Sequence, residues 1–296
     1  MLAAIYRKVI PYSFRKFLYE LFVGKIVFFF RNYKIITKSK FIFLFSFLLP
    51  KTEKNKAYAF IGRYGFTAYP LKYTLDYKDK KFIVEYDNEL KLPYVIHNGK
   101  KLYFPDFYTV DKTSTDYLAL LIEQDERAAH RYVRSYDELK NKTLLDIGSA
   151  EGIFALDTIE ITKDVIIFEC EEYWLKPLRA TFAPWQHKVT FVEKYVGDKT
   201  EGRFVTIDEF LKDHPKTDLF LKMDIEGAER RALKGAEETL SKGRNIQMAI
   251  CTYHQENDPE YMADLVSKYG FTYEFSDGFM CWGQRLSKGL IRCIKE

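Results

Sequence analysis

Short apolar runs separated by segments of helical spacing dominate the chain from residue 143 onwards. Each run is five to eight residues long, which suits a strand better than a helix. Apolar strands that alternate with helices are typical of βαβ units and of a parallel sheet covered on both faces. We therefore predict an open, mostly parallel α/β sheet. Its expected strands are Thr143–Ile147, Val165–Glu169, Val189–Val196, Leu219–Asp224 and Ile246–Thr252.

The stretches around this alternating region have other patterns. Residues 57–112 are rich in Tyr, Phe, Val and Ile and contain turn signals, which predicts a small β-rich cap with strands near Phe82–Tyr86 and Lys101–Pro105. Helical spacing follows over Tyr117–Leu139. The stretch Phe271–Ile294 lacks helical spacing and predicts a closing antiparallel hairpin.

The first 56 residues combine aromatic runs with an excess of cations. They hold 12 Lys and Arg against 2 Asp and Glu, a net charge of +10, so the remaining 240 residues carry −6 of the total of +4. The apolar runs between Leu21 and Leu49 are shorter than the roughly 20 residues of a spanning helix, and they end without a small-residue cleavage site. We expect residues 1–56 to be helical and either to lie on an anionic membrane surface or to pack on the rest of the chain or in a dimer contact.

These patterns divide the chain into the N-terminal segment 1–56, the cap 57–112 and a sheet domain 113–296. The acidic charge of the last two parts argues against a nucleic-acid groove. The cysteines show no C-x-x-C pair and no metal-ligand spacing, which argues against a disulfide framework or a structural zinc site. We expect a cytoplasmic protein, with peripheral contact at the inner face of the membrane if residues 1–56 bind lipid. The cysteines are Cys170, Cys251, Cys281 and Cys293.

The first predicted strand runs directly into a glycine-containing turn and then into a helix. An open α/β sheet binds its ligand at this place, at the carboxyl end of a strand. Gly148 would allow a tight turn close to a ligand, and Gly152 would allow the helix to start against the strand. The G-x-x-x-G spacing lacks the central glycine of the G-x-G-x-x-G sites that bind a pyrophosphate. The turn reads Gly148, Ser149, Ala150, Glu151 and Gly152.

S-adenosylmethionine has no phosphate and suits such a turn. Its methionine end carries a carboxylate and an ammonium group, for which backbone N–H groups of the turn and the Asp146 carboxylate are suitable partners. Glu169 ends the second strand, 17 residues after Gly152, and is placed to accept hydrogen bonds from both ribose hydroxyls. The residues that we expect at the cofactor are Asp146, Gly148, Ser149, Ala150, Glu151, Gly152, Glu169, Val196 and Asp224.

Three further motifs resemble the FkbM family of methyltransferases, whose pattern is T-[IL]-D, then K-x-D-x-E-G-x-E, then L-x-G-A. They begin here at Thr206, Lys222 and Leu233, so that the resemblance covers residues 143–294. The turn at Gly148 departs from the family's usual G-A-N-x-G. The resemblance implies a class I, Rossmann-like methyltransferase fold and, usually, O-methylation of a sugar, a glycolipid or a small-molecule hydroxyl.

Asp224, Glu226 and His254 are the candidate catalytic residues. Asp224 ends the fourth strand, Glu226 opens the next helix and His254 follows the fifth strand, so all three are expected at one edge of the sheet. A hydroxyl acceptor needs a base, or a metal that lowers its pKa. With Asp258, the three would also suit a magnesium ion, which the spacing does not require. The alternative is that Glu226 complements the helix dipole and His254 is a loop residue.

Several alternatives remain open from the sequence. His130 falls in the helical stretch before the first strand and is either within reach of the cofactor or a partly exposed helical residue. The aromatic residues of the cap either stack on a sugar or small-molecule acceptor or belong to the core. A nucleotide-dependent oxidoreductase and a catalytically inactive, membrane-associated binding protein are the competing functions.

Overall fold

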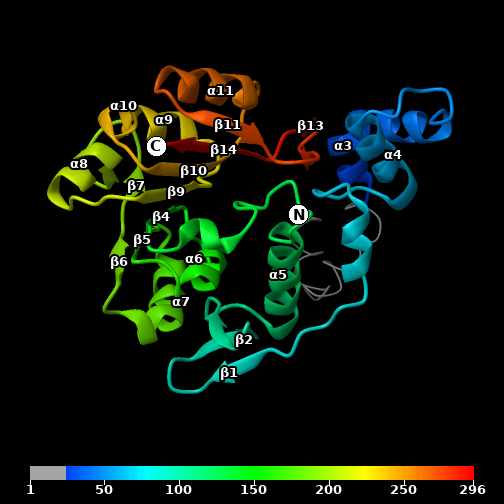
Figure 1. Ribbon diagram of the computed structural model, residues 1–296. Helices are drawn as coiled ribbons and strands as arrows, with labels where there is room; N and C mark the ends of the chain where they lie inside the picture. The colour runs from blue at the N-terminus through cyan, green and yellow to red at the C-terminus, as the bar shows by residue number, and fades with distance from the viewer. Residues whose placement is uncertain (1–24) are drawn as a thin grey trace, which may run out of the picture. The chain divides into compact units, whose positions relative to one another are not determined.

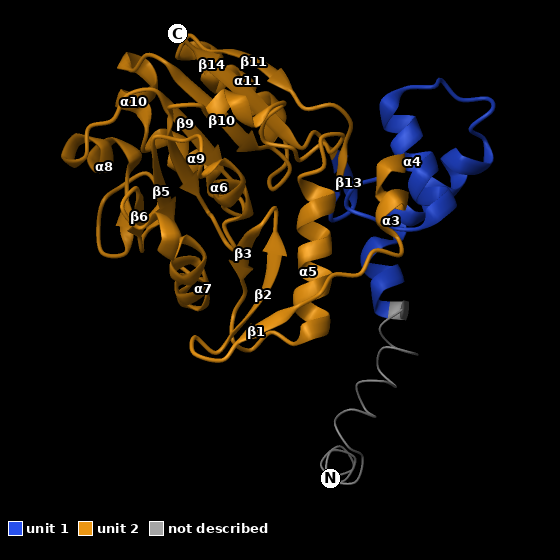
Figure 2. Cartoon of the chain, turned by 60° about the horizontal axis from the view of Figure 1, so that its bottom comes forward, with its two compact units in different colours: residues 1–70, 281–286 blue, residues 71–280, 287–296 orange. Residues whose placement is uncertain are grey.

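The computed structural model describes residues 25–296, which belong to two compact units (Figure 2). The first 24 residues of the predicted N-terminal segment lie outside the described part. One unit contains residues 1–70 and 281–286, and the other contains residues 71–280 and 287–296. The predicted sheet lies in the second unit.

Two packed helices, α3 (Lys25–Leu44) and α4 (Glu53–Tyr64), form most of the described part of the first unit. Gly62 allows the two helices to approach closely, since a Cβ at this position would lie only 2.3 Å from the Ser39 carbonyl oxygen. Lys40 Nζ donates to the Gly62 carbonyl at 2.7 Å. The prediction of helical structure is confirmed from residue 25 to residue 44. No helix in residues 25–296 is long and apolar enough to cross a membrane.

The prediction of strands from residue 57 onwards is wrong for the first part of that stretch. Helix α4 occupies residues 53–64, and a 3₁₀ helix, η2 (Lys72–Tyr77), follows. The aromatic content indicated strands, but the cap of α4 favours a helix: the Thr52 side chain accepts a hydrogen bond from Asn55 N at 3.2 Å, and Glu53 lies in the positively polarised first turn. Ala57, Tyr58 and Ile61 then share the buried side of the helix.

The second unit contains a seven-stranded sheet in the order β11-β14-β10-β9-β4-β5-β6. The five strands from β10 to β6 are parallel, and β14 is antiparallel to both of its neighbours. The predicted parallel sheet with a closing antiparallel hairpin is therefore confirmed. The strands are β4 (Thr143–Ile147), β5 (Asp164–Phe168), β6 (Val189–Val192), β9 (Leu219–Met223), β10 (Ile246–Cys251), β11 (Thr272–Phe275) and β14 (Leu290–Lys295).

Helices cover both faces of this sheet (Figure 1). Leu145 and Ile147 of β4 belong to the core cluster on the side of α8 to α11. Phe220 of β9 faces the other side, where its ring lies 5.9 Å from that of Phe154 on α6. This alternation places Lys222, two residues after Phe220, on the α6 side. The helices are α6 (Ile153–Thr158), α7 (Glu172–Phe182), α8 (Ile207–Asp213), α9 (Glu229–Lys234), α10 (Glu237–Lys242) and α11 (Asp258–Lys268).

A three-stranded antiparallel sheet forms the β-rich cap. It consists of β1 (Glu85–Asp87), β2 (Leu92–His97) and β3 (Lys100–Tyr103). The predicted strand near residues 82–86 is reduced to β1. The buried His97 ring joins the cap to the large sheet's helices, because its nitrogens lie 2.9 Å from Tyr117 Oη and 2.8 Å from Asp157 Oδ1.

Two further expectations require correction. The helix predicted over Tyr117–Leu139 is α5 (Val110–Glu123), followed by turns and by the 3₁₀ helix η3 (Tyr136–Leu139). It stops because Asp125 accepts hydrogen bonds from the backbone N–H and guanidinium of Arg127, which favours a turn.

The predicted strand over residues 189–196 is also divided. Strand β6 ends at Val192, and β7 (Tyr195–Val196) pairs with β8 (Phe204–Val205) in a separate small sheet. Strands β12 (Met280–Trp282) and β13 (Arg285–Ser287) pair as a separate hairpin, which lies between β11 and β14 in the sequence.

The turn after β4 requires a glycine on two grounds, which predicts the stability of Gly148→Ala. Gly148 has a φ of +77°, and a Cβ there would lie 2.0 Å from the Asp224 carbonyl oxygen. Gly202 also has a positive φ, but nothing lies within 4 Å of its added Cβ. We expect Gly202→Ala to cost about 1 kcal/mol and Gly148→Ala about 3 kcal/mol or more in urea unfolding. Equal losses for the two variants would contradict this account of the turn.

Candidate functional site

The carboxyl ends of β4, β5 and β9 meet at one edge of the sheet, and the glycine turn lies there. Gly148, Ala150 and Gly152 all have positive φ values, of +77°, +48° and +81°. Gly148 N donates to the Phe168 carbonyl at 3.0 Å, which ties the turn to the end of β5. The backbone of the turn is thus fixed on the strand that carries Glu169.

Glu169 holds the turn through its carboxylate. Its side-chain oxygens accept hydrogen bonds from the backbone N–H groups of Ala150, Cys170 and Glu171, each at 2.8 Å. The residue is only 7% exposed. Glu169 therefore has a structural task beside the ribose contact predicted for it, because it fixes the left-handed conformation at Ala150.

Beneath the turn lies a buried ion pair between neighbouring strands. Lys222 Nζ on β9 lies 3.0 Å from Asp146 Oδ1 on β4 and also donates to the Gly148 carbonyl. The other Asp146 oxygen accepts from Ser149 Oγ at 2.8 Å. Burial alone would lower the pKa of Lys222, but Asp146 and Asp224 outweigh it and raise that pKa. Both Asp146 oxygens thus stabilise the turn, one through Lys222 and the other through Ser149.

Glu151 is a half-buried acid in the same turn. Burial of its carboxyl and the negative charge of Glu123 raise its pKa to about 8. The carboxyl is therefore mostly protonated at neutral pH. A bound cation would favour the ionised form, because opposite charges in a poorly solvated place attract strongly.

Asp224 follows β9 and keeps a partly exposed side chain at the sheet edge. Its Oδ2 accepts from Tyr132 Oη at 2.9 Å and lies 3.4 Å from His130 Nε2, and its Oδ1 lies 3.6 Å from His254 Nε2. Burial alone would raise the pKa of Asp224, but the hydrogen bond and charge of His130, with the charges of Lys222 and His254, hold it well below its usual value. Asp224 is therefore an ionised acceptor and a weak base.

His254 is aimed at this edge by a carboxylate behind it. Its Nδ1 lies 2.9 Å from Glu229 Oε1, which also accepts from Ile225 N. Its Nε2 lies 3.6 Å from Asp224 Oδ1 and 3.7 Å from Glu226 Oε2. Burial alone would lower the pKa of His254, but Glu229, then Asp224 and Glu226, raise it. The three predicted catalytic residues are thus brought together.

His130 is not the partly exposed helical residue considered from the sequence. It lies in the turns after α5 and is fully buried. Its Nε2 lies 3.0 Å from Tyr253 Oη and 3.3 Å from Cys251 Sγ. Burial alone would lower the pKa of His130, but the carboxylates of Glu123 and Asp224 help to raise it well above its usual value. His130 therefore stabilises the ionised form of Asp224 from the protein interior.

Two expected site residues have other surroundings. Val196 is 6% exposed and belongs to the core cluster. Asp258 is the first residue of α11. Its Oδ1 lies 2.7 Å from Arg230 Nε, and its Oδ2 accepts from Gln255 N at 2.7 Å. Asp258 is thus occupied by cationic and backbone donors and is a poor candidate for a metal ligand.

Within residues 25–296, two sets of side chains have ligand atoms within 4.8 Å of one another. They are His130, Asp224 and Cys251, and Asp224, Glu229 and His254. The second set shares Asp224 and His254 with the metal ligands considered from the sequence. Its oxygen and nitrogen donors suit a divalent cation in kind, with Glu226 close to His254 on the exposed side.

Sequence reasoning missed Lys222, Glu229 and Tyr132 as parts of the site. Lys222 and Glu229 are the first and last charged members of the K-x-D-x-E-G-x-E motif, so the motif itself held that signal. Tyr132 and His130 come from an irregular segment before β4, where no spacing rule applies. The two other family motifs are structural: Asp208 N donates to the Gly235 carbonyl at 3.0 Å.

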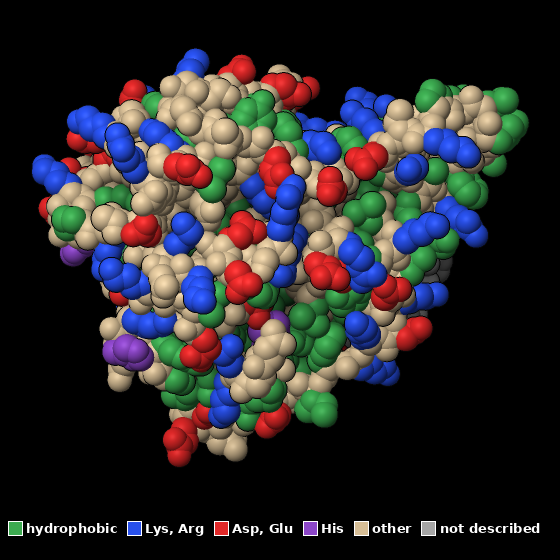
Figure 3. Space-filling view, viewed as in Figure 1, with side chains coloured by type: hydrophobic (Ala, Val, Ile, Leu, Met, Phe, Trp, Pro, Cys, Tyr) green, Lys and Arg blue, Asp and Glu red, His purple; other side chains and the backbone are tan. Residues whose placement is uncertain are grey.

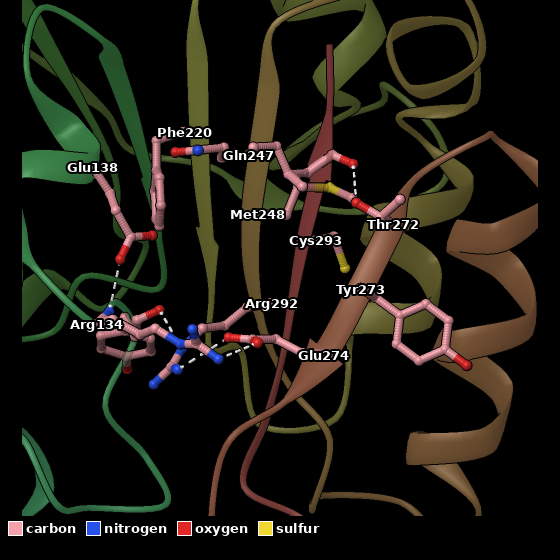
Figure 4. A pocket seen from close by; sticks show the side chains of 12 residues that line it. Arg134, Glu138, Phe220, Gln247, Met248, Thr272, Tyr273, Glu274, Arg292 and Cys293 are labelled. Carbon is pink, nitrogen blue, oxygen red and sulfur yellow. Dashed lines mark hydrogen bonds and ion pairs between the residues drawn. The ribbon is translucent and has the colours of Figure 1, made fainter.

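The cavity in Figure 4 lies at the other end of the strands. It has a volume of about 300 Å³ and is lined by Phe220 and Gln247, each the second residue of its strand. Its arginines, Arg134 and Arg292, are both paired with Glu274. The cavity thus lies at the amino ends of these strands, and it shares one lining residue, Tyr132, with the surroundings of Asp224.

Solved structures with a similar chain trace include methyltransferases. Precorrin-6y C5,15-methyltransferase from Geobacter metallireducens GS-15 is 12% identical, with 54% of this chain and 84% of that chain covered and a TM-score of 0.38. An rRNA methylase from Streptococcus thermophilus is 14% identical, with 54% and 90% covered and a TM-score of 0.35. No curated protein matches the chain by sequence.

The family comparison gives a match over the sheet domain. The model of the methyltransferase FkbM domain matches residues 104–273, a range that takes in the glycine turn, Glu169, the K-x-D-x-E-G-x-E motif and His254. It covers more than half of the 296 residues. The competing interpretation as an oxidoreductase is thereby set aside, and the chain belongs to the FkbM family of methyltransferases.

Proposed function

We propose that this protein transfers the methyl group of S-adenosylmethionine to a hydroxyl of a sugar, glycan, glycolipid or small metabolite. Family membership supports methyl transfer. The observation that carries the choice of a hydroxyl is His254, whose Nε2 is directed to the sheet edge beside Asp224 by the buried Glu229. A neutral amine is nucleophilic enough without a base, whereas a sugar hydroxyl is a weak nucleophile that needs one.

The turn and its neighbours supply suitable contacts for the cofactor. Glu151 suits the ammonium group of the methionine moiety, whereas the N–H groups of Gly148 and Ala150 are already donated to Phe168 and Glu169. Glu169 suits the ribose hydroxyls, since a carboxylate at the end of the second strand is the usual partner of a ribose. Lys222 and Asp146 then keep the turn in shape from below.

His254 is a better candidate base than Asp224. In its neutral form Nε2 would accept the hydroxyl proton while the hydroxyl oxygen attacks the methyl carbon and the methyl–sulfur bond breaks. The methyl group ends on oxygen, the proton on His254, and S-adenosylhomocysteine leaves with the electron pair. Asp224 and Glu229 stabilise the imidazolium that forms. The low pKa of Asp224 makes it unsuitable as the proton acceptor.

Exposed aromatic rings near the end of β5 suit a sugar acceptor. Tyr173, four residues after Glu169, is 46% exposed, and its ring lies 5.9 Å from that of Phe107, which is 62% exposed. Tyr108 and Trp174 extend the group, with ring centroids 6.1 Å apart. The C–H face of a sugar ring stacks well on such surfaces. These rings are our candidate platform for the acceptor.

The proposed activity is tested by screening labelled methyl transfer from S-adenosylmethionine onto extracts of surface glycans, lipids and small metabolites. A labelled product with a methyl ether supports the proposal. Binding of the cofactor with no transfer to any fraction would favour the inactive binding protein instead. A labelled amine or thioether would replace the hydroxyl by another acceptor atom.

Two substitutions of Glu169 should separate its contribution to cofactor binding from its contribution to the stability of the fold. Glu169→Gln keeps one oxygen, for either the Ala150 N–H or the N–H groups of Cys170 and Glu171, which bond to different oxygens of Glu169. It also loses the charge and part of the ribose contact. We expect the dissociation constant for S-adenosylmethionine to be at least tenfold larger in calorimetry, with a smaller loss of stability than in Glu169→Ala. Glu169→Ala should weaken both, because it also releases the turn at a cost of about 1–3 kcal/mol. An unchanged affinity in both variants would rule out the ribose contact.

His254 predicts the pH dependence of turnover. The base acts when neutral and its pKa is raised above 6.5, so kcat should increase as pH rises through that higher value. Glu229→Gln keeps the hydrogen-bond geometry but removes a negative charge, so the rise should move to lower pH. His254→Ala should lower kcat by about 10²–10⁴ and leave cofactor affinity nearly unchanged.

A chelator titration of the wild type separates general-base catalysis from activation by a metal. Full activity in chelator supports the base alone, and activity restored by magnesium or manganese indicates that Asp224 and His254 act through a metal. If Glu229→Gln leaves the pH profile where it was, His254 is not the titrating base.

Glu151 predicts proton release on cofactor binding. Its pKa of about 8 falls when a cationic ammonium group lies beside it, so S-adenosylmethionine should bind more tightly as pH rises towards 8. Calorimetry in two buffers of different ionisation enthalpy measures the protons released. Glu151→Gln should release fewer protons under the same conditions, and an identical count would show that Glu151 does not meet the ammonium group.

A further inference from the structure

An exposed group of large apolar side chains lies at the end of α3 and in the turn that follows it. We call this group, which consists of five residues, the apolar tip. Proteins rarely expose so many neighbouring large apolar residues without a partner. Its members are Phe41 (58% exposed), Leu44 (64%), Phe45 (40%), Phe47 (77%) and Leu48 (70%). Figure 3 shows hydrophobic side chains gathered at one end of this unit.

The apolar tip does not serve the core of its own unit. On α3 the buried positions are Asn32, Ile35, Ser39 and Ile42, which recur at helical spacing on another side of the helix. That side packs on α4, where Gly62 allows the close approach. Phe47 and Leu48 lie beyond the helix in the turn, so neither packing demand nor helix formation explains their apolar character.

The backbone of the apolar tip is hydrogen-bonded within itself. Phe45 N donates to the Phe41 carbonyl at 3.1 Å, and Leu48 N donates to the Phe45 carbonyl at 2.9 Å. The Asn55 side chain donates to the Pro50 carbonyl at 2.9 Å. A turn with satisfied polar groups can leave water at a lower cost than an open loop.

The charged residues on α3 and in the turn after it are all cations, and the first acid, Glu53, opens α4 beside Lys54 and Lys56. From Lys25 to Thr52 the sequence contains no Asp or Glu. Over the same stretch the exposed cations of the described side chains are Arg31, Lys34, Lys38, Lys40 and Lys51. Aromatic rings beside such cations match the interface of a bilayer with anionic headgroups, where rings sit at the acyl boundary and ammonium groups meet phosphates.

We propose that the apolar tip inserts into the interface of an anionic phospholipid bilayer and holds the protein at the membrane surface. The cations fix its orientation on the phosphates, while Phe47 and Leu48 enter the boundary between headgroups and acyl chains. A protein partner would need a dense set of acids around an apolar centre, whereas an anionic bilayer offers both over any area. The proposal is independent of the methyl acceptor.

The test uses the full-length protein with vesicles of phosphatidylglycerol and phosphatidylethanolamine, and with phosphatidylcholine vesicles for comparison. The wild type should co-sediment with the anionic vesicles and bind them at least tenfold more weakly at high salt. Phe47→Ser with Leu48→Ser should weaken binding roughly tenfold or more, because two large apolar side chains no longer leave water. The matched control is Ile83→Ser, since Ile83 is 82% exposed in the other unit.

A second readout reports insertion directly. In Phe47→Trp, the emission of the new tryptophan should shift to shorter wavelength on anionic vesicles and be quenched by brominated acyl chains. Unchanged circular dichroism and thermal unfolding in all variants show that the fold is retained. Failure of the wild type to bind anionic vesicles at low salt would overturn the proposal, as would equal binding by the double serine variant. A tip variant that changes a dimer to a monomer in sedimentation velocity, with lipid binding unaltered, would assign the surface to a second copy.

Discussion

The buried ammonium group of Lys222 connects the two strand ends on which the candidate site depends. It lies between the Asp146 carboxylate and the Gly148 carbonyl, and the side chains of Lys222 and Asp146 are 5% and 1% exposed. Taking both charges out of water is costly, and loss of either partner alone would leave an unpaired buried charge, which typically costs about 3–5 kcal/mol. The pair thereby fixes the register of β4 and β9 at the level of the turn.

Beyond this pair, charges alternate in sign along the sheet edge. Glu123 faces His130, His130 faces Asp224, Asp224 faces His254, and His254 faces Glu229. Each histidine is favoured in its charged form by the acids on either side of it, and His130 and His254 help to lower the pKa of Asp224 in turn. Such a chain suits a reaction in which a proton arrives on a histidine, because the field that receives the charge exists before the reaction.

The sequence predicted the positions of this site better than its connections. Strands β4, β5, β9 and β10 were expected within one residue of their observed limits, because strands buried on both faces are mostly apolar. Asp224 and His254 were expected together because parallel strands end at one edge. The contacts of Lys222, His130 and Tyr132 depend on register and on an irregular segment, which apolar periodicity does not encode. Helix α4 was missed because its aromatic residues outweighed the capping signal at Thr52.

The departure of the turn from the family's usual G-A-N-x-G has a physical explanation in the same contacts. The family's Asn falls at Ala150, whose φ of +48° lies in the left-handed region that Asn adopts more readily than Ala. Ala150 is held there because its N–H donates to Glu169. Ser149 in turn donates to Asp146 of β4. The turn is therefore fixed by a side chain of β4 and by one at the end of β5. The backbone shape that a ligand would meet is therefore kept by side chains outside the motif.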